Sequence, residues 1–420
     1  MVSFLFSGPP ENEEGPQKNC PVRYIQLTPV MGFPFNCDVM EFVAGSADPG
    51  LLFTYHFPRQ SRPLYLLTGT LLGYPIYWMD KPFHGYINSK TPANFKAELP
   101  PEKISLYFSH YAGLVLLNLV ILIASLYFFE ELIFYFTGSW ANGSLVRFAS
   151  WIFLISSQVT KKFFWVPHQQ VFNVFLPLFA IWLFIRVAHA VRTKKQLAVL
   201  SLISGTLLLY YGSFLVLLPL LMIAIARSAR ISNSGWPSMI RSMAISLLGF
   251  CIPLLLWMAV LKLSGNDLYS RETDVFRQFV WINDSIGSIP YLLTSLNEHA
   301  FTYLGTFAVL VFPLFLLLAM IFKGIASRST SRPDETETKP TGQVFILVFS
   351  LLFIFYYLLG YYADRLTYTM APPLILATFI LLNRQRTTPV FQKLIFLLSI
   401  CWHLFLIFCE MPHFSERFYY

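Results

Sequence analysis

Two acidic residues near the start of the chain have the spacing that acid–base chemistry at a membrane surface would use. Asp38 and Glu41 stand three positions apart and would share one face of a helix. A carboxylate beside a bilayer can act as a general base, especially if burial raises its pKa. The alternative is structural, because Asp38 opens a helix-like run and Asp is a favoured N-cap residue.

Two groups of basic residues could bind an anion such as a lipid phosphate. Arg59 and Arg62 are close in sequence, and guanidinium groups bind phosphate through paired hydrogen bonds, although snorkelling beside a helix start is an alternative. Lys161, Lys162 and His168 form the second group. If this segment is extracytoplasmic, its lysines run against the positive-inside trend, which indicates either an anionic ligand or a different topology.

A further candidate lies late in the chain, between two apolar runs. Arg365 and Tyr368 precede Pro372 and Pro373. An arginine at the mouth of a membrane helix could bind a lipid phosphate, and the proline pair indicates an interrupted helix. Asp364 could instead neutralise this arginine locally.

The remaining motifs narrow the function classes. Residues 271–277 carry acidic and basic side chains at the spacing of ion pairs on a helix surface. The sequence has no P-loop, no GxGxxG after a strand, no HExxH and no GxSxG, which argues against an ATP-driven pump and several hydrolase classes. It also has no CxxC or histidine-rich metal spacing.

The elements that must position these residues are long and apolar. Of 420 residues, 55% are hydrophobic and 12% are charged, whereas soluble domains carry about 25% charged residues. The net charge of +8 comes from short basic clusters between apolar runs, which is typical of cytoplasmic loops facing anionic lipid. We therefore expect membrane lipids as partners and no nucleic acid.

The apolar runs predict an all-α, polytopic integral membrane protein of roughly 10 transmembrane helices with extracytoplasmic loop helices. Residues 146–160 form a shorter apolar run, and 196–226 is a long run with basic residues at both ends, which indicates two short helices that fold out and back. The clear candidate spans are 107–136, 171–190, 238–262, 301–322, 343–363, 367–383 and 392–409.

Basic clusters set the expected orientation, with cytoplasmic loops near 192–195, 227–241, 323–342 and 384–393. Residues 61–79 could cross the membrane or lie flat on it, and only the second arrangement leaves Asp38 outside. Cys20 and Cys37 could pair if they are extracytoplasmic.

We divide the chain into four parts: a polar N-terminal segment 1–36, a first outer loop 37–106 with juxtamembrane helices, a transmembrane domain 107–409, and an outer tail 410–420. The transmembrane domain includes the outer loop 263–300 and the cytoplasmic linker 323–342.

Taken together, these residues resemble the GT-C glycosyltransferases, which are multi-spanning enzymes that use polyprenyl-phosphate-linked sugars. The likeness is greatest to the group of protein O-mannosyltransferases and the lipid A aminoarabinose transferase. It rests on the split run 196–226 and on three short motifs: Asp38 with Phe42, Arg62-Pro63-Leu64-Tyr65, and Arg365 with Tyr368, Pro372 and Pro373. Two features depart from the family pattern, because Val39 replaces the second acid of its acidic dipeptide and residues 21–37 lack the composition of its first transmembrane helix.

The resemblance implies an inverting transfer of a sugar from a polyprenyl-phosphate donor to a lipid, glycan or protein acceptor at the extracytoplasmic face, most simply of a bacterial inner membrane. Asp38, with Glu41 beside it, would act as general base or orient the acceptor hydroxyl. The basic residues and Tyr368 would bind the donor and stabilise its leaving phosphate: Arg59, Arg62 and Arg365 first, then Lys162 and His168. A divalent metal would be compatible with this chemistry, although no ligand cluster points to one.

Two other functions fit the same helices and outer charges. A lipid-linked oligosaccharide or solute transporter would use them without catalysis, although we find no matched pair of broken helices such as transporters often carry. An O-antigen polymerase or ligase-like protein would use the outer loop 263–300, which contains Arg271, Arg277 and His299.

Overall fold

A computed structural model of the chain describes residues 23–28, 31–91, 100–139, 143–190, 193–311, 341–362, 364–384 and 387–408. Helices make up nearly all of the described part. The exception is an antiparallel hairpin of β1 (Arg23–Thr28) and β2 (Met31–Phe35). The all-α prediction is therefore correct for the membrane body and wrong for this hairpin, which lies in the segment expected to be merely polar.

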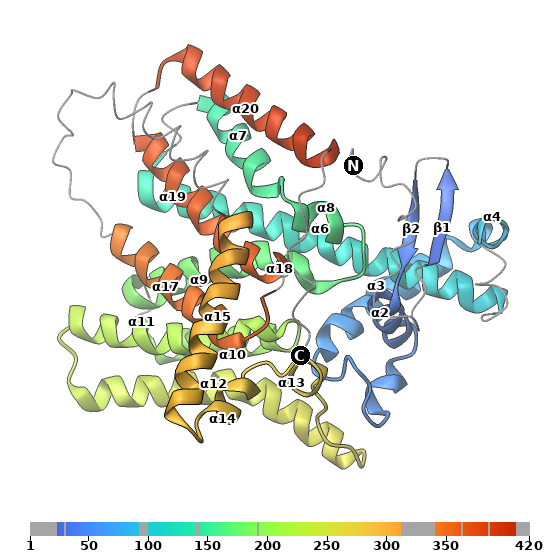
Figure 1. Cartoon of the computed structure of the whole chain (residues 1–420), viewed down its shortest axis with the longest axis horizontal. Coiled ribbons are helices and arrows are strands. Elements are labelled where there is room, and N and C mark those ends of the chain that lie inside the picture. Colours follow the sequence, from blue (N-terminus) through green and yellow to red (C-terminus); the bar gives the residue numbers. More distant parts are fainter. Residues whose placement is uncertain are drawn as a thin grey trace.

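The N-terminal unit is built on the first half of a single long helix, α6 (Pro101–Thr137) (Figure 1). Glycines bring α3 against α6, because a Cβ at Gly73 would meet His110 and a Cβ at Gly113 would meet the backbone of Gly73. The hydroxyl of Tyr65 donates to Asn118 at 3.4 Å, so α3 runs antiparallel to α6 and begins near its midpoint. The other elements of the unit are α2 (Cys37–Ala47), η1 (Pro49–Phe53), α3 (Pro63–Met79), η2 (Lys81–Phe83) and α4 (His84–Lys90).

The second half of α6 continues into a body of helices, many of which have the length and composition of membrane spans (Figure 1). Its first elements are α7 (Gly143–Ile155), α8 (Gln158–Phe163), η3 (Gln169–Val171), α9 (Phe172–Ile185), the π-helical η4 (Arg186–Ala190), α10 (Lys194–Leu208), η5 (Gly212–Val216), α11 (Leu217–Ile231) and α12 (Trp236–Leu263). They are followed by α13 (Arg271–Asp274), α14 (Val280–Ser285), α15 (Ile289–Leu310), α17 (Thr341–Leu359), α18 (Asp364–Thr367), η6 (Tyr368–Met370), α19 (Ala371–Arg384) and α20 (Pro389–Phe408).

Within the described residues, seven helices are long and apolar enough to cross a membrane, which indicates a multi-pass membrane protein. The expected number of roughly 10 is not reached. The run 146–160 yields only the short α7, and 301–322 is offset, because α15 begins at Ile289 and residues 312–340 lie outside the described part. The outer tail 410–420 also lies outside it.

The run 196–226 divides as predicted into two short helices, α10 and α11, joined by η5. Small residues let α10 approach α12 closely, because a Cβ on Gly205 would meet the carbonyl of Phe250. The hydroxyls of Ser201 and Ser246 lie 2.7 Å apart in the same contact. The turn at Tyr211 follows this contact, and the hydroxyl of Tyr211 donates to Asn173 of α9.

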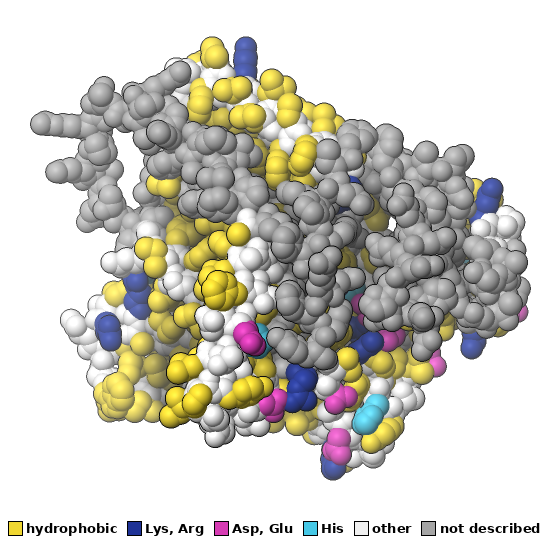
Figure 2. Space-filling model, in the orientation of Figure 1, with side chains coloured by type: hydrophobic (Ala, Val, Ile, Leu, Met, Phe, Trp, Pro, Cys, Tyr) yellow, Lys and Arg dark blue, Asp and Glu magenta, His cyan; other side chains and the backbone are white. Residues whose placement is uncertain are grey.

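Burial separates central helices from lipid-facing ones. In the most apolar 18-residue window of Gln169–His189, which contains α9, 89% of the residues are buried, and α9 is apolar on all sides apart from Asn173. In contrast, 28% of the α12 window is buried, and Leu248, Leu255 and Leu256 are exposed. Figure 2 shows such apolar side chains over the lower left of the molecule, where α11 and α12 lie.

The two ends of the body differ in charge. Basic residues such as Lys194, Lys195, Arg227 and Arg241 lie at the ends of α10, α11 and α12 that are remote from the N-terminal unit. The positive-inside rule predicts that this remote end is cytoplasmic and that the end carrying the N-terminal unit is extracytoplasmic. Because α3 runs along the first half of α6 and away from the spans, this arrangement favours the alternative that leaves Asp38 outside (Figure 1).

Candidate functional site

Charged side chains from distant parts of the chain meet where the N-terminal unit joins the helical body. We call this set the outer cluster. Its members come from α2, from the turn before α3, from the turn before η3, and from α13 and α18. They are Asp38, Glu41, Arg59, Arg62, His168, Arg271, Glu272 and Arg365.

The two carboxylates of α2 are held by one buried arginine. Asn36 is the N-cap of α2, since its side chain accepts from the backbone N–H of Val39 at 2.9 Å. The capping alternative for Asp38 is therefore wrong, and the predicted shared face of Asp38 and Glu41 is confirmed. Arg59 donates to Asp38 and lies 2.7 Å from Glu41. Only 5% of the Arg59 side chain is exposed, which snorkelling would not produce.

Arg62 forms a second buried ion pair that ties the outer loop to the N-terminal unit. Its guanidinium lies 2.5 Å from Glu272 of α13, whose carboxylate also accepts from Ser61 at 3.3 Å. Arg271 makes a parallel link, 2.7 Å from Glu41. Burial raises the pKa of Glu272, but the nearby arginines and these hydrogen bonds outweigh it and lower the pKa. The prediction of helix-surface pairs is therefore wrong for these two loop residues, because the four-residue α13 is too short for them.

His168 faces Asp38 in its neutral form. Its Nδ1 accepts from the backbone N–H of Gln170 at 3.3 Å, so in the neutral ring Nε2 carries the proton. This Nε2 lies 3.8 Å from Oδ2 of Asp38. Burial, with the charges of Arg365 and Arg59, lowers the pKa of His168 to about 4 despite the opposing effect of Asp38.

The Asp38 carboxylate is ionised and partly open. Burial would raise its pKa, but the Nε2–H of His168 that faces it and the positive charges of Arg59 and Arg365 hold it well below its usual value. The condition that would have made this carboxylate a stronger base, a pKa raised by burial, is therefore not met. The side chain keeps 36% of its surface exposed, compared with 5% for Arg59. Asp38 is thus an ionised side chain that remains accessible from outside the protein.

Arg365 brings a positive charge to the same place without a described carboxylate partner. The carbonyl of Arg365 accepts from Asn173 at 2.5 Å, and its guanidinium donates to the hydroxyl of Tyr361 at 3.3 Å. No described carboxylate lies within ion-pair distance of it, and its buried Nε has no hydrogen-bond partner. The side chain of Asp364 lies outside the described part, so local neutralisation by that residue is not tested.

The other predicted residues lie around this set. Tyr368 is buried in η6, near Ser157 of α8. The side chain of Lys162 is outside the described part, while Lys161 lines a cavity of about 120 Å³ between α6, α8 and α20.

Several residues that position the outer cluster were not predicted from the sequence. Gln169 can turn its amide oxygen toward the Arg62 guanidinium, and Asn173 accepts from Tyr211 at 2.8 Å. Asn118 donates to the carbonyl of Val166 at 2.9 Å and thereby fixes the turn before His168. The only sequence signal for these residues is a polar side chain within, or at the end of, an apolar run.

The arrangement does not fit a metal centre. The described residues contain no group of three or more histidine, cysteine, aspartate or glutamate side chains that could hold an ion. The two acids of α2 are instead engaged by Arg59 and Arg271, and His168 presents a proton rather than a lone pair to Asp38.

Comparison of the chain with protein-family models, with curated proteins and with solved structures gives no significant match.

Proposed function

We propose that the chain is a glycosyltransferase that moves a sugar from a polyprenyl-phosphate donor to an acceptor hydroxyl at the extracytoplasmic face of the membrane. The observation that carries the proposal is an accessible, ionised Asp38 beside an Arg365 that has no described carboxylate partner. In the outer cluster three carboxylates face four guanidinium groups, so one positive charge is left for an anionic ligand. A phosphate at the lipid boundary supplies such an anion.

The outer position of the outer cluster has two independent supports. Basic residues gather at the opposite end of the body, as the positive-inside rule requires of the cytoplasmic side. Cys37, one residue before Asp38, is disulfide-bonded, and disulfides persist in oxidising, extracytoplasmic compartments. Both agree with a lipid-linked donor, because nucleotide sugars are cytoplasmic whereas lipid-linked sugars can be presented outside.

In the proposed reaction the acceptor oxygen bonds to the anomeric carbon while the bond from that carbon to the phosphate oxygen breaks. The bonding electrons leave with the lipid phosphate, and Arg365 stabilises the charge that develops there. The acceptor hydroxyl becomes strongly acidic as its oxygen bonds to the anomeric carbon. A weak base such as Asp38 then suffices to take its proton.

His168 has a positioning role in this scheme. It is neutral at pH 7, and its Nε2 proton faces the same carboxylate that must receive the acceptor proton. From 3.8 Å this N–H favours the ionised form of the carboxylate until the acceptor proton arrives. Arg59 acts in the same way from the other side of the carboxylate.

Transfer can be tested with purified chain in proteoliposomes that contain a polyprenyl-phosphate-linked radioactive sugar and crude acceptor. We expect Asp38→Asn to lower the release of polyprenyl phosphate by about 10²–10⁴-fold. Arg365→Gln should lower it by about 10²-fold or more. A matched control is Asp284→Asn, which removes an exposed acid that pairs with Arg277 on the outer face.

The outcomes separate transfer from the alternatives. Donor cleavage that Asp38→Asn leaves unchanged would remove Asp38 from the mechanism. Donor that crosses the bilayer intact would indicate a transporter. A product in which whole lipid-linked glycans are joined would indicate a polymerase or ligase.

A further inference from the structure

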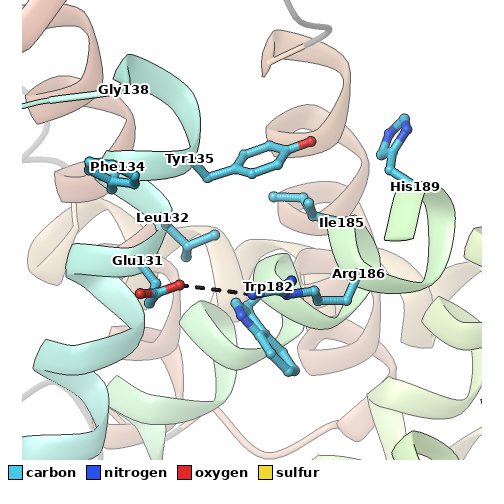
Figure 3. A pocket seen from close by; sticks show the side chains of 9 residues that line it. All are labelled: Glu131, Leu132, Phe134, Tyr135, Gly138, Trp182, Ile185, Arg186 and His189. Atoms are coloured by element: carbon cyan, nitrogen blue, oxygen red, sulfur yellow. Dashed lines mark ion pairs between the residues drawn. The ribbon is translucent and has the colours of Figure 1, made fainter. Parts of the chain in front are cut away.

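A cavity of about 380 Å³ lies at the cytoplasmic end of the body, and the proposed reaction does not use it. Its walls come from the end of α6, the end of α9 and η4 (Figure 3). On α6 the cavity ends at Gly138, which stands about 30 Å along the helix axis from Asn118 beside the outer cluster. Glu131, at the other end of the cavity, stands about 20 Å from Asn118 along the same axis. The hydrocarbon core is about 30 Å thick, so the cavity lies in the cytoplasmic half of the membrane and reaches its boundary at Gly138.

A carboxylate and a guanidinium face each other at this cavity, but they do not form a close ion pair. The Arg186 guanidinium lies 3.9 Å from the carboxylate of Glu131, and their side chains are 49% and 41% exposed. Figure 3 shows this pair above the ring of Trp182, which lies 5.3 Å from the guanidinium carbon. An ion pair this long and this exposed stabilises the fold little, so a ligand can separate its partners at little cost.

The backbone is irregular at the same point. After Ile185 the helix widens into the π-helical η4, which carries both Arg186 and His189. Single π-turns of this kind occur frequently at functional sites. Arg227 of α11 is also close, since its charge acts on both Tyr135 and His189. Two arginines, Arg186 and Arg227, therefore lie near the cavity, which Glu131 lines from the other side.

A neighbouring face of α6 provides a contrast with the same residue types. There Arg147 lies 3.2 Å from Glu130 and 4.9 Å from the ring of Trp151. That ion pair is closed, and neither charged residue lines the cavity. The open geometry of the Arg186 pair is thus a feature of the cavity and is not shared by every arginine, acid and tryptophan at this end.

We propose that the cavity binds a phospholipid of the cytoplasmic leaflet with a phosphoethanolamine headgroup. Arg186, with His189 beside it, takes the phosphate, and Glu131 takes the ammonium, which two carbons separate from the phosphate ester. The rings of Tyr135 and Trp182 pack against the glycerol and the first acyl carbons, as aromatic residues do at headgroup depth. A soluble phosphoethanolamine ester carries the same charges, but the apolar wall and the depth of the cavity favour the lipid.

The test uses delipidated full-length chain in detergent and native mass spectrometry, with phosphatidylethanolamine or phosphatidylcholine as the added lipid. We expect phosphatidylethanolamine to bind about fivefold or more tightly than phosphatidylcholine, because a trimethylammonium group cannot donate hydrogen bonds to Glu131. Arg186→Gln should weaken binding about tenfold, and Glu131→Gln should remove the preference between the two lipids. Arg147→Gln is the matched control and should bind as the unaltered chain does.

Three results would overturn the proposal. The first is equal binding of phosphatidylethanolamine by Arg186→Gln and by the unaltered chain. The second is equal affinity for the two lipids in the unaltered chain. The third is displacement of the lipid by soluble glycerophosphoethanolamine at equal concentration, which would assign the cavity to a soluble phosphorylated compound. Because both substituted residues are well exposed, we expect both variants to fold, and size-exclusion chromatography with circular dichroism checks this.

Discussion

The buried imidazole of His168 should make the stability of the protein depend on pH in a defined window. In the unfolded chain a histidine takes up its proton near pH 6.5, whereas the folded protein holds the pKa of His168 at about 4. Between these values the unfolded state binds more protons, so the unfolding free energy falls as the pH is lowered. The loss is about 1.4 kcal/mol for each pH unit, or about 3 kcal/mol over the whole window.

The variant His168→Gln isolates this contribution, because its amide can still donate toward Asp38 but does not titrate. We expect the thermal midpoint of the unaltered chain in detergent, followed by tryptophan fluorescence, to fall several degrees further than that of the variant between pH 7 and pH 4.5. Above pH 7 the two midpoints should change in parallel, since the imidazole is neutral in both folded and unfolded states. Parallel midpoints across the whole range would refute the reasoning, because the imidazole would then be equally protonated in both states.

Three further substitutions test the contacts that hold the outer cluster and the spans. Arg59→Gln leaves two carboxylates without their shared cation and should lower the unfolding free energy by about 3–5 kcal/mol. Glu272→Gln leaves Arg62 buried without its carboxylate, so we expect a similar loss together with faster proteolysis of the loop after α12. Gly205→Ala presses a methyl group on the carbonyl of Phe250 and should cost about 1–3 kcal/mol by parting α10 from α12. Thermal midpoints in detergent measure all three, and an unchanged midpoint would contradict the contact concerned.

The spans were predictable from the sequence because hydrophobic length is a local property of the chain. The candidates 107–136, 238–262 and 392–409 differ from α6, α12 and α20 by only a few residues at most ends. The division of 196–226 was also predictable, since basic residues at both ends of an overlong run exclude a single crossing.

The partners within the outer cluster could not be predicted, because they are brought together only by the packing of distant elements. Arg62 pairs with Glu272 of the outer loop, which local spacing assigned to a helix surface. The direction of the Asp38 pKa is equally non-local, since it depends on Arg59, His168 and Arg365. Even the cap of α2 was assigned to the wrong residue, because Asn36 and Asp38 are both favoured N-caps and the carboxylate is taken up by Arg59.

The protonation states in the outer cluster bear on how the proposed transfer would be driven. An aspartate held well below its usual pKa beside a neutral histidine is a poor base toward an intact hydroxyl. The barrier must then be lowered mainly at the other end of the breaking bond, where a phosphodiester becomes a phosphate monoester and gains charge. Arg365, which has no described carboxylate partner, is the group that can respond to this change, because its interaction with the phosphate strengthens as that charge develops.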